Sequence, residues 1–73
     1  MELKSYLSQE RGRSTNMARA LNTSPGFITM IANGRKAVPP QKAVAIEQYT
    51  NGLVTRKDLR PLDYAKFWPE LAD

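Results

Sequence analysis

The chain contains no cysteine and no histidine. The absence of cysteine excludes a disulfide framework and a thiolate zinc site, and the absence of histidine removes the usual general base of enzymes. The seven carboxylates are scattered along the sequence, and no glycine-rich phosphate loop is present. We therefore expect a protein that is not an enzyme and that holds no metal, no cofactor and no small-molecule ligand.

Long apolar runs are also missing. No stretch approaches the ~20 residues of a membrane-spanning helix, and the first segment, MELKSYLSQERGR, is too polar and too acidic for a signal peptide. These features predict a cytoplasmic protein without membrane contact. The 73 residues predict a single domain over 1–73. Because so small a core is marginal, a second subunit would help to stabilise it, and we expect a homodimer.

Acidic residues are absent from the middle of the chain. No carboxylate lies between Glu10 and Glu47, whereas five acids accompany four bases from Glu47 onward. A small domain can be basic by chance, so the uneven distribution matters more than the net charge of +4. A basic segment without acids favours a nucleic-acid partner. Its cations are Arg11, Arg13, Arg19, Arg35, Lys36 and Lys42.

The same segment carries the residue spacing of a helix-turn-helix. Ala18 is small enough to let a second helix approach, and Asn22 lies where the chain must reverse. That reversal requires positive φ. Glycine adopts this conformation most readily, and asparagine is the next residue type to tolerate it. Ile28 and Ile31 then have the spacing of residues that face back into a core. The outer face of that helix is left with Gly26, Thr29, Met30 and Asn33, a set that can contact base edges.

Local signals predict the helices of the first half. The spacing of Leu3, Tyr6 and Leu7 predicts a helix over residues 2–10 that stops at Gly12. A second helix is expected to be capped by Ser14 or Thr15, with Met17, Ala18 and Leu21 inside. The third helix starts at Ser24 and Pro25, runs to Ala32 or Asn33, and stops at Gly34.

The second half predicts one longer helix and short turns. After Pro39 and Pro40, a helix runs to Asn51–Gly52, and a single further turn follows a cap at Thr55. Pro69 is expected to take Trp68 out of regular helix. No strand, repeat or long linker is indicated. The core face of the longer helix is expected to hold Ala43, Ile46 and either Tyr49 or Thr50.

Most of the chain, from residue 3 to about 61, resembles the small Cro-type repressors of lambdoid phages and their prophage relatives, including the YdaS-type regulators of bacterial genomes. The most similar pieces are SPGFITMIANGRK, the following VPP and the AIEQYTNG and VTRKDLRP segments. The resemblance implies an all-α, five-helix, lambda-repressor-like fold. It also implies a homodimeric transcriptional repressor that binds a pseudo-palindromic DNA operator in a bacterial host cell, with the third helix in the major groove.

The resemblance also implies where the chain contacts DNA. Pro25, Gly26 and Met30 replace the amide or lysine side chains of many relatives, so thymine methyl contacts and DNA shape are expected to contribute to specificity. Arg35 is expected to reach a base edge or a phosphate. The base-reading positions fall on Ser24, Pro25, Gly26, Thr29, Met30 and Asn33. The expected phosphate contacts are Arg13, Ser14, Thr15, Asn16, Arg19, Arg35 and Lys36.

Other interpretations of these residues stay open. Thr29 and Met30 could form a protein interface, and Arg35 and Lys36 could belong to a solvated loop. The apolar tail, residues 62–73, is expected to cap the core or to form the dimer contact through Phe67, Trp68 and Leu71. The alternative function is an antitoxin-type interaction module that neutralises a partner protein through this tail.

Overall fold

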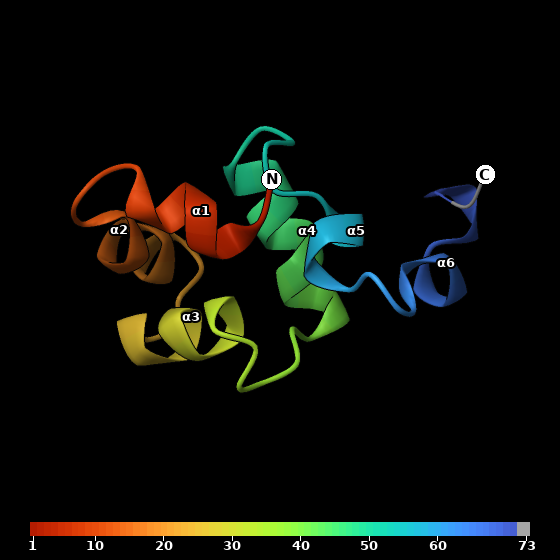
Figure 1. The fold of residues 1–73 in the computed structure, drawn as a ribbon, viewed down its shortest axis with the longest axis horizontal. Helices are drawn as coiled ribbons and strands as arrows, with labels where there is room; N and C mark the ends of the chain where they lie inside the picture. The colour runs from red at the N-terminus through yellow and green to blue at the C-terminus, as the bar shows by residue number, and fades with distance from the viewer. Residues whose placement is uncertain (72–73) are drawn as a thin grey trace.

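The computed structural model describes residues 1–71, so Ala72 and Asp73 of the predicted tail lie outside the described part. These residues form an all-α fold without strands, which confirms the expected class (Figure 1). The first five helices correspond to the predicted elements, and a sixth, one-turn helix lies in the tail. In order they are α1 (Leu3–Ser8), α2 (Arg13–Ala20), α3 (Pro25–Ala32), α4 (Pro40–Tyr49), α5 (Arg56–Leu59) and α6 (Tyr64–Phe67), followed by a 3-10 turn (Pro69–Leu71).

The core is built from the apolar faces of α2, α3 and α4. Met17, Ile28 and Ile46 are completely buried, one from each of these helices. Of the two residues predicted as alternatives for the core face of this segment, Thr50 is buried at 3% exposure, whereas Tyr49 is 37% exposed. The rest of the core consists of Leu3, Ala18, Ile31, Val38, Ala43 and Val54.

Residues in the left-handed backbone conformation form the turns before and after α3. Asn22 has φ 57°, which confirms the conformation expected between α2 and α3. Gly34 has φ 75°, and the Arg35 N–H donates to the Met30 carbonyl at 2.9 Å. This bond closes the carboxyl end of α3 in the way that helix-terminal glycines allow.

The connection between α1 and α2 differs from the prediction. α1 ends at Ser8, and Gly12, with φ 88°, precedes α2 instead of ending α1. The predicted cap at Ser14 or Thr15 is wrong, because the left-handed glycine lets α2 begin at Arg13 and places both hydroxyl residues inside its first turn. The predicted caps of α3 and α5 are confirmed. The Ser24 Oγ accepts from the Phe27 N–H at 3.1 Å, and Thr55 forms a capping box with Asp58.

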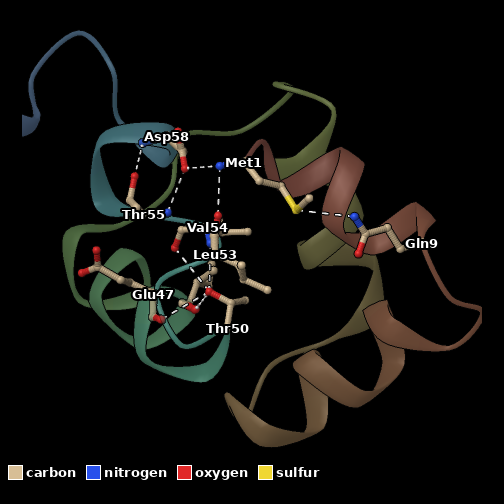
Figure 2. Close-up of polar contacts among 9 residues, drawn as sticks. Met1, Gln9, Glu47, Thr50, Leu53, Val54, Thr55 and Asp58 are labelled. Carbon is tan, nitrogen blue, oxygen red and sulfur yellow. Dashed lines mark hydrogen bonds and ion pairs between the residues drawn. The ribbon is translucent and has the colours of Figure 1, made fainter.

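Polar contacts hold the turn between α4 and α5 against the start of the chain (Figure 2). The Thr50 hydroxyl donates to the Ile46 carbonyl at 2.9 Å and accepts from the Val54 N–H at 3.1 Å. The α-amino group of Met1 donates to the Asp58 carboxylate at 2.8 Å and to the Leu53 carbonyl at 2.9 Å. These bonds order a turn that buries little apolar surface apart from Val54.

Two arginines of the α5 region hold the tail. Arg56 pairs with Glu47 at 2.7 Å, and its guanidinium carbon lies 5.3 Å from the ring centroid of Trp68. Arg60 follows α5, donates to the Val38 carbonyl and stacks on Phe67 at 4.8 Å. As expected, Trp68 leaves regular helix before Pro69, with φ −132° and ψ 77°. The tail therefore packs on its own domain through cation–aromatic contacts.

Candidate nucleic-acid interface

The reading face predicted for α3 is exposed in the structure. Ile28 and Ile31 point into the core, at 0% and 7% exposure, so the opposite side of the helix faces solvent. Met30 on that side is 41% exposed. The structure brings together the four residues predicted on this outer face, all exposed: Gly26, Thr29, Met30 and Asn33.

The exposed side chains of α3 offer few hydrogen-bond donors. The Thr29 hydroxyl donates to the Pro25 carbonyl at 3.0 Å, so its methyl group and oxygen lone pairs are what it presents outward. The Ser24 hydroxyl oxygen accepts from the Phe27 N–H, so the one proton of this hydroxyl is what it can still donate. Met30 has only a weakly accepting thioether. Asn33 supplies the one amide of this surface. Such a face suits apolar contact with thymine methyls better than two-pronged hydrogen bonding.

The amino ends of α2 and α3 are free of acidic side chains. No side chain caps α2, and its first turn contains no carboxylate, so its first N–H groups lack partners among residues 1–71. Ser14, Thr15 and Asn16 lie in this turn. At the start of α3, a Cβ on Gly26 would meet only the Ser24 Oγ, at 4.0 Å. Both helix ends are open to an approaching anion.

Cations flank this surface without acidic partners. Arg11, Arg19 and Arg35 are exposed, and none forms an ion pair within residues 1–71. Lys36 is exposed beside α3, with its ammonium 5.7 Å from the centroid of the Phe27 ring. The loop after α3 therefore presents two accessible positive charges next to the reading face.

Two cations of the same segment have internal roles that sequence reasoning missed. The Arg13 guanidinium donates to the Tyr6 carbonyl at 3.0 Å and to Glu10 at 2.8 Å, and it stacks on the Tyr6 ring at 4.3 Å. Arg13 thus ties α2 to α1, and its predicted phosphate contact stays a prediction. Lys42 donates to the Leu21 carbonyl at 2.8 Å, at the carboxyl end of α2. The three-residue spacing of Glu10 and Arg13 could have indicated the ion pair of Arg13. No local feature of the sequence indicated the contact of Lys42 with Leu21.

The residues predicted for the dimer contact lie together in the tail. Phe67 is 44% exposed, and its ring centroid lies 5.8 Å from that of Trp68. Trp68 and Leu71 are half-buried, and Trp68 packs against the core. The single chain does not test whether these residues touch a second copy.

Other kinds of site find no support in the part of the chain that the structure describes. No helix there is long and apolar enough to cross a membrane. Likewise, residues 1–71 contain no group of acidic side chains placed to hold a metal ion.

The fold and this surface define a small all-α helix-turn-helix domain. Residues 5–66 match the family model described as "Bacterial toxin YdaS", so the chain belongs to the YdaS family. It is also 34% identical over 65 residues to a protein of Escherichia coli (strain K12) described as a prophage transcriptional regulatory protein. That alignment covers 88% of this chain and 98% of the relative.

Proposed function

We propose that this protein is a prophage transcription regulator, a Cro-like repressor that binds double-stranded DNA by sequence. The observation that carries the proposal is the exposed, acid-free outer face of α3, flanked by cations that form no ion pair within residues 1–71. The description of the Escherichia coli relative supports the regulatory role. The proposed role is one of binding and not of catalysis, in the cytoplasm of a bacterial host.

In the proposed complex, α3 lies in the major groove, which admits one helix. The amino end of α2 directs the N–H groups of residues 13–15 at one phosphate strand, and the polar side chains of Ser14, Thr15 and Asn16 lie nearby. Arg35 and Lys36, in the loop after α3, approach the backbone beside the groove. Arg19 adds a further phosphate contact. Bound in this way as a homodimer on a pseudo-palindromic operator, the protein blocks access to a promoter.

Sequence choice in this proposal rests on shape and methyl contacts. Thr29 and Met30 project from the middle of α3 and touch thymine methyl groups, while Ser24, Pro25 and Gly26 allow the helix start to approach closely. Asn33 is the residue of α3 able to form paired hydrogen bonds with adenine. A preference for thymine-rich half-sites follows.

An antitoxin-type module that neutralises a partner through its tail is the competing function. That role requires the aromatic residues of the tail to be available to the partner. Trp68 instead packs against its own core under Arg56, and Phe67 is stacked by Arg60. The self-packed tail supports the repressor, although a repressor can also act as an antitoxin.

The test is to select binding sites from random duplexes with the purified protein. We expect a two-fold symmetric site rich in thymine contacts. Single-base variants of that site, titrated at one salt concentration, then measure base reading by Thr29→Ala and Met30→Ala. Each substitution should relax the preference at particular base pairs by about 1–3 kcal/mol at most. Equal loss on every variant would remove these residues from base reading, and failure to enrich any site would remove the proposed function.

A further inference from the structure

A hollow with a volume of about 210 Å³ opens between α1, the first turn of α2 and the outer side of α3. α1 packs against both other helices (Figure 1) and contributes Lys4 to the hollow, while α2 contributes Ser14. Thr29 and Asn33 line the side of α3. Both belong to the reading face, so the hollow is continuous with the surface that we assign to DNA. The contacts predicted so far include no residue of α1.

Three side chains of this hollow keep their hydrogen-bond donors unused within residues 1–71. They are the Lys4 ammonium, the Ser14 hydroxyl and the Asn33 amide. The hydroxyls of Ser8 and Thr29, by contrast, donate to carbonyls of their own helices at 2.9 and 3.0 Å. No carboxylate lines the hollow. A cation and two neutral donors around a hollow without acids favour an anion as the occupant.

Lys4 also borders a neighbouring hollow, whose lining includes Glu2 and Asp58. It forms an ion pair with neither of them in the described structure, and the Asp58 carboxylate binds the Met1 α-amino group at 2.8 Å. Lys4 is exposed, and its flexible four-carbon stem lets the ammonium turn toward either hollow. An anion in the hollow beside α3 can therefore recruit Lys4 without breaking an internal ion pair.

We propose that this hollow receives one phosphodiester group of the DNA backbone, with the Lys4 ammonium as its counter-charge and the Ser14 hydroxyl as a hydrogen-bond donor. This role of Lys4 rests on the proposed function, because it requires α3 to lie in the major groove. A phosphodiester fits better than a base edge, since lysine binds phosphate as a point charge and the first turn of α2 faces the backbone in that arrangement. The half-buried Leu7 and Ala32 give the hollow an apolar part that suits the adjoining deoxyribose. α1 is then a third helix that contacts DNA.

Asn33 lies where the reading face meets the hollow, and it can serve both. A paired contact with adenine uses the amide oxygen and one N–H of this side chain. The second N–H remains for the phosphodiester group. Asn33 therefore links the reading of one base to the position of the neighbouring backbone.

Fluorescence anisotropy of a labelled duplex at several salt concentrations compares the wild type with Lys4→Ala and Lys4→Arg. A duplex of random sequence comes first, so that the result does not depend on an operator. Lys66→Ala is the matched control, because Lys66 is also an exposed lysine and lines neither hollow that Lys4 borders. Circular dichroism and thermal unfolding verify that each variant folds.

We expect Lys4→Ala to weaken binding on the order of tenfold at 0.1 M salt and to reduce the slope of log affinity against log salt by about 0.9. Lys4→Arg keeps the charge and should keep the slope. Lys66→Ala should change neither quantity. On a selected site, duplexes with one neutral methylphosphonate at each position in turn locate the contact. At the phosphate bound in the hollow, the replacement should weaken the wild type by about tenfold and Lys4→Ala by less than about twofold, because the cation is already missing.

If Lys4→Ala binds DNA with the affinity and the salt slope of the wild type, the role of Lys4 is overturned and the proposed function stands. A loss confined to particular base pairs, with an unchanged slope, assigns Lys4 to a base edge and also overturns it. A Lys4-dependent slope on random duplexes, together with failure to enrich any site, leaves the role of Lys4 standing and removes the proposed sequence-specific function. A wild type that binds no duplex at all overturns both.

Discussion

The two halves of the molecule use the same kinds of residue for different purposes. Around α2 and α3, Arg11, Arg19 and Arg35 have no acidic partner within residues 1–71. Around α5 and α6, Arg56 and Arg60 each bind a carboxylate and an aromatic ring of their own chain. The number of cations in a segment therefore says less about binding than the number left without internal partners.

Threonine shows the same division on a smaller scale. Thr29 and Thr50 each donate to the carbonyl four residues earlier in their helix, at 3.0 and 2.9 Å. Thr50 is buried and also accepts from the Val54 N–H, whereas Thr29 is exposed on the reading face. One hydroxyl satisfies the interior of the protein, and the other lies on the surface that we assign to DNA.

Replacing Thr50 by valine gives the largest expected effect on stability, and the same change at Thr29 is its control. Thr50→Val leaves the buried Val54 N–H without its partner, so we expect the free energy of unfolding to fall by about 1–3 kcal/mol. Thr29→Val, the matched control, should change it by less than about 0.5 kcal/mol, as for other exposed positions. Urea unfolding measures both values. Equal losses would show that the two hydroxyls contribute alike to the fold.

Alanine substitution in the loop after α3 probes the other side of the comparison. If Arg35 and Lys36 contact phosphates, each substitution should weaken binding to all DNA sequences on the order of tenfold at 0.1 M salt, and reduce the slope of log affinity against log salt by about 0.9. Arg35→Ala should leave stability unchanged, because Arg35 has no ion-pair partner in the described structure. Lys36→Ala removes only an exposed contact with the Phe27 ring, so its cost should be at most about 1 kcal/mol. Titrations at several salt concentrations measure the slope.

Lys66→Ala is the control for that experiment, since Lys66 is an exposed cation on α6. It should leave both the affinity and the salt slope as in the wild type. If Lys66→Ala reduces the salt slope as much as the loop substitutions do, the cations act through the net charge of the protein. Specific phosphate contacts by Arg35 and Lys36 would then be rejected.

Much of the fold was predictable because its signals are local. The Ser24 and Thr55 caps, the asparagine turn at Asn22 and the stop at Gly34 each depend on residues within a few positions along the chain. The exception at α1 and α2 has a local cause as well, because glycine can end one helix or precede the next, and the sequence does not distinguish these roles.

The internal partners of the cations were not predictable in the same way. Lys42 binds a carbonyl 21 positions away and Arg60 binds one 22 positions away, so their roles depend on how the helices pack. The exposure of Leu62 also depends on packing, since apolar spacing alone would place a leucine inside. The candidate site was therefore predicted by residue type and helix face, but the availability of its charges required the structure.

The smallest expected effect is a pH dependence confined to the α5 side. Burial alone would raise the pKa of Asp58, but hydrogen bonds from the Met1 α-amino group and from Thr55 hold it below its usual value of 3.8. A lowered folded-state pKa means that this group stabilises the fold above the pKa of the unfolded chain and loses that contribution as the pH falls through the folded value. The unfolding free energy should thus decline slightly below about pH 4.

Asp58→Asn keeps an oxygen to accept from Thr55 but removes the charge. The unfolding free energy of this variant should therefore change less between pH 5 and 3 than that of the wild type, as urea unfolding at each pH measures. If the variant and the wild type decline in parallel, Asp58 contributes nothing to acid sensitivity, and the decline arises from other carboxylates such as Asp63, whose pKa the hydrogen bonds from Arg60 lower.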